Sequence, residues 1–155
     1  MPHSSLKTSG FTLIELLIVV VIMAILASVS VGGYRQYVQR ANRVDATSAL
    51  LRISAAQERF YLQNNRYATT PDELADPPSA GLGISSTQHN LYDLAVEAGP
   101  DGAAAGYIAT ATASSDGSQR DDDDCRIFSI DQSGQRRAAD AGGSANAETT
   151  ARCWR

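Results

Sequence analysis

The first long pattern in the chain is an apolar run over residues 11–31, in which Glu15 is the one charged side chain. A helix of this length rises about 31 Å, close to the roughly 30 Å of hydrocarbon in a bilayer. The run is apolar on every face, unlike an amphipathic surface helix. It therefore predicts a membrane-spanning helix. A cleaved secretory signal, with small residues at 27–29 as a cleavage site, is the alternative, but its apolar stretch is typically about 7–15 residues.

A helical pattern continues from this run to about Asn64. Apolar positions recur with helical spacing along one line, which predicts an amphipathic helix lying on a globular core. These positions are Ala46, Ala49, Leu50, Ile53, Ala56 and Phe60. A weaker line, Leu51, Ala55 and Leu62, lies nearly opposite the first. It faces either a neighbouring subunit or simply the solvent.

Shorter patterns follow in the second half of the chain. Thr70 before Pro71 predicts the cap and first position of a short helical turn. Alternating positions predict strands over residues 91–97, 107–113 and 125–131, and a turn after Asp131 predicts a return strand over 135–139. One apolar face per strand is typical of an antiparallel sheet covered on one side. Residues 138–150 are small and polar and are expected to form a loop.

Charge and cysteine content limit the kinds of protein to consider. The net charge of −4 argues against a dedicated nucleic-acid binder, although it does not exclude a local basic patch. Two cysteines and two histidines are too few for a structural zinc site. Cys125 and Cys153 both follow the apolar run, and an even count in a small exported domain predicts one disulfide; two unrelated buried thiols are the alternative.

The charges that flank the apolar run conflict with the export of the second half of the chain that the predicted disulfide implies. Arg35, Arg40 and Arg43 follow it, whereas Lys7 is the only basic side chain among the first ten residues apart from His3. A count of flanking positive charges would place the second half of the chain in the cytoplasm. The predicted disulfide requires the opposite orientation, and we adopt that one.

The apolar run opens with Gly10-Phe11-Thr12-Leu13-Ile14-Glu15, and here the sequence resembles the type IV prepilins, the subunits of type IV pili and type II secretion filaments. The resemblance covers residue 10 to about residue 37. It implies a leader, residues 1–10, that a prepilin peptidase cuts between Gly10 and Phe11 at the inner membrane. The same enzyme would then N-methylate Phe11. Residues 11–37 would form the membrane-spanning and filament-core half of the long helix, and 38–155 the periplasmic, later extracellular, globular domain.

Glu15 is the informative residue of this motif, since a carboxylate inside an apolar span costs about 2.5–3.5 kcal/mol on insertion scales. The resemblance names a partner: the free amine of Phe11 on an adjacent subunit. Such a pair in a dry bundle is costly when mismatched and would check register during assembly. Gly32-Gly33 departs from the family, where many members carry proline. We expect the helix to bend or melt there in the filament.

The resemblance also implies the fold class: α+β, a long helix on a small antiparallel sheet with one C-terminal disulfide. Size and Cys153-Trp154 make a minor pilin of the PilE/ComP kind the best match. The implied function is a filament subunit for pilus biogenesis, twitching motility or adhesion. Its partners would be other pilins, the peptidase, the assembly platform and the inner membrane. A type II secretion pseudopilin and a DNA-uptake pilin are the alternatives.

No set of residues predicts an enzyme or a cofactor. Asp121, Asp122, Asp123 and Asp124 form a weak candidate for calcium, although they lack the spacing of an EF-hand. Arg136, Arg137, Arg152 and Arg155 form a weak candidate for nonspecific contact with DNA phosphates. The acidic run beside these arginines argues against it, and we do not expect nucleic acid among the partners.

Overall fold

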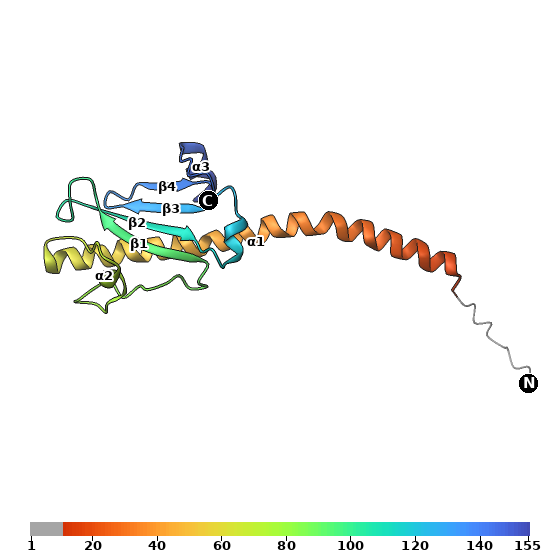
Figure 1. Cartoon of the computed structure of the whole chain (residues 1–155), viewed down its shortest axis with the longest axis horizontal. Helices are drawn as coiled ribbons and strands as arrows, with labels where there is room; N and C mark the ends of the chain where they lie inside the picture. The colour runs from red at the N-terminus through yellow and green to blue at the C-terminus, as the bar shows by residue number, and fades with distance from the viewer. Residues whose placement is uncertain (1–10) are drawn as a thin grey trace, which may run out of the picture. The chain divides into compact units, whose positions relative to one another are not determined.

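The protein is described by a computed structural model that covers residues 11–155. Its internal contacts divide the chain into two units, the first ending at Tyr37 and the second comprising Val38–Arg155. Helix α1 (Leu13–Asn64) contributes to both units (Figure 1). Gly10 and the rest of the expected leader lie outside the described residues.

Within the described residues, the first unit contains the amino-terminal part of α1, and the large apolar side chains between Leu13 and Leu26 are exposed. Phe11 is 91% exposed and Leu16 64% exposed. Burial of such side chains in water-free surroundings is strongly favourable, at about 25 cal/mol for each Å². By length and composition, α1 is able to cross a membrane, as the apolar run predicts.

The second unit is built on a four-stranded antiparallel sheet in the order β1-β2-β3-β4. Its strands are β1 (Tyr92–Ala98), β2 (Tyr107–Ala113), β3 (Ile127–Asp131) and β4 (Arg136–Ala139). Tyr92 pairs with Ala113, and Phe128 pairs with both Ala111 and Ala138 on either side of it. The carboxyl-terminal part of α1 lies along the sheet in Figure 1. This arrangement confirms the predicted α+β class.

The core lies between α1 and one face of the sheet. The predicted stripe on α1 is confirmed, because all six of its residues are buried. From the sheet, Tyr92 and Phe128 meet edge to face, with their ring centroids 5.7 Å apart. In β2 the inward face carries Tyr107, Ala109 and Ala111, all completely buried. The β-branched residues of β2 therefore lie on the opposite face.

A disulfide joins Cys125 to Cys153, across 28 positions of the sequence, as predicted. The expectation of a loop over 138–150 is wrong at both ends. Ala138 and Ala139 belong to β4, and helix α3 (Ala147–Cys153) begins within the supposed loop. The side chain of Asn146 caps this helix by accepting a hydrogen bond from the amide of Thr149 at 2.8 Å. Small polar residues carry no apolar periodicity, so the pattern missed α3.

Two smaller helices complete the unit. Helix α2 (Pro71–Ala75) starts as predicted, with Thr70 accepting a hydrogen bond from the amide of Glu73. The chain then doubles back so tightly that a Cβ at Gly81 would lie 2.3 Å from the carbonyl oxygen of Glu73. The 3₁₀ helix η1 (Ser118–Asp121) precedes the aspartate run.

Candidate assembly and binding sites

The amino-terminal site is a local pairing of Thr12 with Glu15 at the start of α1. The amide and the hydroxyl of Thr12 both donate to Oε2 of Glu15, each at 2.9 Å. In return, the amide of Glu15 donates to the Thr12 hydroxyl oxygen at 3.3 Å. This reciprocal arrangement is a capping box. The sequence signal for it, threonine followed three residues later by glutamate, is present, but the interpretation of Glu15 as a partner for an amine does not include it.

The capping box leaves part of the Glu15 carboxylate for another donor. Both Thr12 hydrogen bonds end on Oε2, so Oε1 remains an acceptor within the described part of the chain. Phe11 lies directly before this box and is exposed. The structure thus holds Glu15 at the end of α1 adjoining the expected cleavage point.

A buried ion pair is the most constrained feature at the start of the second unit. Nε of Arg43 lies 2.7 Å from Oδ2 of Asp122, and its second nitrogen donates to Oδ1 at 2.8 Å. The two side chains are only 9% and 2% exposed. Oδ1 of Asp122 also accepts the amide of Cys125 at 3.2 Å. The pair therefore joins α1 to the turn that carries the disulfide.

The four consecutive aspartates lie near different partners. Asp122 is buried against Arg43, whereas Asp121, Asp123 and Asp124 lie near Arg120, Arg126 and Arg152 respectively. Among residues 11–155, no group of three or more metal-ligating side chains is close enough to hold an ion. The weak calcium candidate is therefore not supported by the geometry.

The four candidate DNA-contacting arginines fall into two separate places. Arg136 and Arg137 of β4 line a hollow of about 450 Å³ together with α3. The guanidinium of Arg136 lies over the ring of Trp154, 5.1 Å from its centroid, and the Trp154 indole donates to the carbonyl of Arg137 at 2.9 Å. Arg152 and Arg155 line a different hollow.

That second hollow has a volume of about 430 Å³ and lies where α1 enters the second unit. Its lining combines side chains from α1 with residues of the disulfide-bonded end. They are Arg40, Arg43, Asp124, Arg152, Cys153 and Arg155. Sequence reasoning grouped Arg152 and Arg155 with the β4 arginines, and nothing in the spacing of the chain indicated that Arg40 lies beside them.

Asp45 forms a buried anchor for the connection that leads into β1. Its carboxylate accepts hydrogen bonds from the His89 amide at 3.1 Å and the Leu91 amide at 3.4 Å, and lies 3.2 Å from the His89 ring nitrogen. Burial raises the pKa of Asp45, but the hydrogen bonds from this connection outweigh burial and hold the pKa below its usual value.

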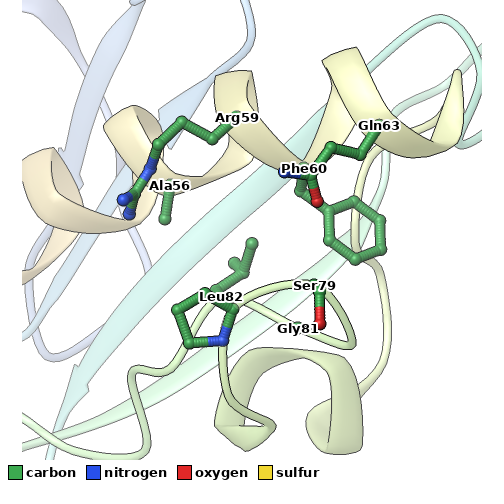
Figure 2. A pocket seen from close by; sticks show the side chains of 8 residues that line it. Ala56, Arg59, Phe60, Gln63, Ser79, Gly81 and Leu82 are labelled. Atoms are coloured by element: carbon green, nitrogen blue, oxygen red, sulfur yellow. The ribbon is translucent and has the colours of Figure 1, made fainter.

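A further, much smaller hollow lies between α1 and the chain around Gly81, and Figure 2 shows it. Its volume is about 80 Å³, and its lining includes Ala56, Phe60 and Leu82. In Figure 2, the Leu82 side chain points toward α1 across this hollow. A space of this size holds a few waters at most, so it is a packing defect rather than a ligand site.

Comparison with known proteins adds two family matches. A model of the prokaryotic N-terminal methylation motif matches residues 6–31. A model described as type IV minor pilin ComP, DNA uptake sequence receptor, matches residues 33–129, more than half of the chain. The chain also has a long helix with an apolar amino-terminal part, an antiparallel sheet and a disulfide, and it is a type IV pilin. Within this class, it belongs to the ComP family of minor pilins, which confirms the predicted kind.

Individual relatives include proteins of type II secretion systems and type IV pilins. The chain is 38% identical over 77 residues to the type II secretion system core protein G of Aeromonas hydrophila, covering 48% of this chain and 54% of that protein. It is 33% identical over 75 residues to the type IV major pilin PilA of Myxococcus xanthus, covering 48% and 34%. The chain thus spans about a third to just over half of the length of these relatives. A type IV pilin structure from Shewanella oneidensis has a TM-score of 0.44 at 24% identity, covering 63% of this chain and 89% of that one.

Proposed function

We propose that this chain is a minor subunit of a type IV pilus, made as a precursor and processed before assembly. Residues 1–10 are the leader, cleavage falls between Gly10 and Phe11, and Phe11 becomes the methylated amino terminus. Residues 11–37 span the inner membrane with the amino terminus in the cytoplasm, and residues 38–155 form the outer domain. The observation that carries the proposal is the methylation-motif match over residues 6–31, which includes the start of a helix able to span a membrane.

Glu15 then has two successive partners. Before cleavage, Phe11 has no free amine, and the Thr12 capping box supplies the hydrogen bonds of the carboxylate. This lowers the cost of placing Glu15 in an apolar span. After cleavage, the Phe11 amine of a neighbouring subunit reaches the same carboxylate through the remaining acceptor, Oε1. Because an unpaired charge is expensive in a dry bundle, the pair favours one axial register.

The proposal is tested on filaments sheared from the producing cells. Mass spectrometry should find peptides that begin with N-methylated Phe11, and should find this chain at a small fraction of the main subunit. Filaments that contain the chain with Met1 intact would contradict the processing. A stoichiometry equal to that of the main subunit would contradict the minor role. Filaments of a secretion system containing this chain would favour the pseudopilin alternative.

The role of Glu15 is tested with Glu15→Gln, which keeps the shape and removes the charge. We expect normal cleavage and methylation but at least a tenfold lower incorporation into filaments, because the amine loses its counter-charge. Glu58→Gln is the matched control, since Glu58 is an exposed glutamate of the same helix. Equal incorporation of both variants would refute the pairing.

DNA binding is a second candidate, favoured by the matched family's description as a DNA uptake sequence receptor. The sequence alone predicts no nucleic acid among the partners. Arg136 and Arg137 beside Trp154 supply cations and an aromatic ring on one surface, although they lie beyond the matched residues 33–129. A gel shift by the detergent-solubilised chain should weaken with salt and with Arg136→Gln/Arg137→Gln. It should persist in the control Arg52→Gln/Arg59→Gln, and an unshifted wild-type chain would exclude this candidate.

A further inference from the structure

The arginine-lined hollow at the entry of α1 into the second unit has an unbalanced positive charge. Four of its lining side chains are arginines and one is an aspartate. Arg43 is neutralised by Asp122 behind it, so Arg40, Arg152 and Arg155 face the hollow against Asp124 alone. Arg152 lies 3.4 Å from Asp124, and Arg40 has no ion-pair partner among residues 11–155. Apart from the Arg43–Asp122 pair, the side chains of the lining therefore carry a net charge of about +2.

The chemistry of the lining selects an anion with several oxygens. Arginine presents a planar fork of donors that matches phosphate oxygens in pairs. The hollow, at about 430 Å³, is large enough for a phosphate with a small attached group. Because the neighbouring Arg43 is held by two hydrogen bonds to Asp122, one wall of the hollow is rigid.

The position along the chain favours a lipid as the source of that phosphate. Arg40 is nine residues beyond the end of the apolar run at Val31. Nine residues of helix rise only about 14 Å, and the headgroup layer on each face of a bilayer is about 5–8 Å deep, so the long side chain of Arg40 can extend down to the outer edge of that layer. By contrast, Asp121 and Asp123, which are 68% and 89% exposed, precede the lining residue Asp124 in the chain. They would repel a long polyanion such as DNA more than a single headgroup held within the hollow.

We propose that this hollow binds the phosphate-bearing headgroup of an anionic phospholipid at the membrane surface while the subunit waits for assembly. The contact would hold the second unit against the bilayer through Arg40 and Arg152. The proposal rests on the membrane anchoring proposed above, whereas its test requires neither processing nor filament formation.

The test uses the full chain in a neutral detergent, offered equal amounts of phosphatidylglycerol and phosphatidylcholine, with retained lipids counted by native mass spectrometry. The wild-type chain should retain phosphatidylglycerol preferentially. Arg40→Gln/Arg152→Gln should weaken that retention roughly 30-fold, whereas Arg52→Gln/Arg59→Gln, with the same charge change on exposed arginines farther along α1, should not. Equal retention of both lipids, or equal loss in both variants, would overturn the proposal.

A variant that is expected to bind lipid more tightly distinguishes loss of the binding site from misfolding. Asp124→Asn removes the carboxylate of the lining and should strengthen retention of phosphatidylglycerol several-fold, a result that misfolding cannot produce. Millimolar glycerol phosphate should compete with the lipid because it carries the same phosphate. Binding of glycerol phosphate without preferential lipid retention would overturn the lipid source. Loss of duplex DNA binding in Arg40→Gln/Arg152→Gln with lipid retention unchanged would overturn the site's assignment to lipid.

Discussion

Replacing Asp122 with asparagine should destabilise the second unit far more than the same change at the next residue. Asp122→Asn keeps the size of the side chain and an oxygen that can accept the Cys125 amide, but it leaves the 9%-exposed Arg43 without a counter-charge. Removing one partner of a buried ion pair typically costs about 3–5 kcal/mol. Asp123 is 89% exposed and lies 3.4 Å from Arg126, an arrangement typically worth less than about 1 kcal/mol.

The assay is denaturant and thermal unfolding of the oxidised full chain in detergent, followed by the fluorescence of Trp154, its single tryptophan. For a unit of this size, the expected loss corresponds to roughly 10–20 °C in Tm. Asp123→Asn should shift Tm by no more than a few degrees. The double variant Arg43→Met/Asp122→Leu should recover part of the loss, since an apolar pair carries no buried charge but leaves the Cys125 amide without its acceptor. A Tm for Asp122→Asn equal to that of Asp123→Asn would refute the reasoning.

Three further predictions use the same unfolding assay. Asp45→Asn should destabilise the unit at pH 7. Because folding lowers the pKa of Asp45, its ionised carboxylate stabilises the wild-type unit, and that stabilisation should be lost as the pH falls below about 4. The Asp45→Asn variant should not show this loss. Gly81→Ala should cost about 1–3 kcal/mol by forcing Cβ against the Glu73 carbonyl, whereas Gly142→Ala, where Cβ meets one side-chain oxygen at 3.4 Å, should be nearly neutral. Reducing the Cys125–Cys153 disulfide should cost roughly 3–4 kcal/mol, given its 28-residue separation, and an unchanged unfolding midpoint after reduction would contradict this.

Local patterns predicted most of the fold because each element repeats with a simple period. The stripe from Ala46 to Phe60 identified the buried face of α1, and the helix ends at Asn64 as expected. Strand β2 has the predicted bounds, Tyr107–Ala113, while β1 and β3 differ by one or two residues at their ends. Helix α3 was not predicted because its only sequence signal is one capping asparagine, Asn146, in an otherwise small and polar stretch.

The candidate sites were only partly predictable, because their members are far apart in sequence. Arg43 and Asp122 are separated by 79 positions, so no spacing rule could pair them, and Asp122 looked like one of four equivalent solvated acids. Likewise, nothing local related Arg40 to Arg152. The spacing of Thr12 and Glu15 indicates a capping box, but the interpretation of Glu15 as the partner of an amine does not predict it. That Glu15 pairs with a neighbouring amine stays a prediction, as do the cleavage after Gly10 and the behaviour of Gly32-Gly33 in the filament.

The order of the strands has a consequence for how the domain matures. Each strand pairs with the next one along the chain, so every closure in the sheet is short, a topology that favours rapid folding. The disulfide is the exception, since Cys153 follows all four strands. In the proposed orientation, Cys153 leaves the reducing cytoplasm only after the whole sheet has been exported. Oxidation of this pair would therefore follow export of the whole sheet, and a thiol-reactive probe could separate subunits whose sheet is still in transit from those whose sheet has been exported.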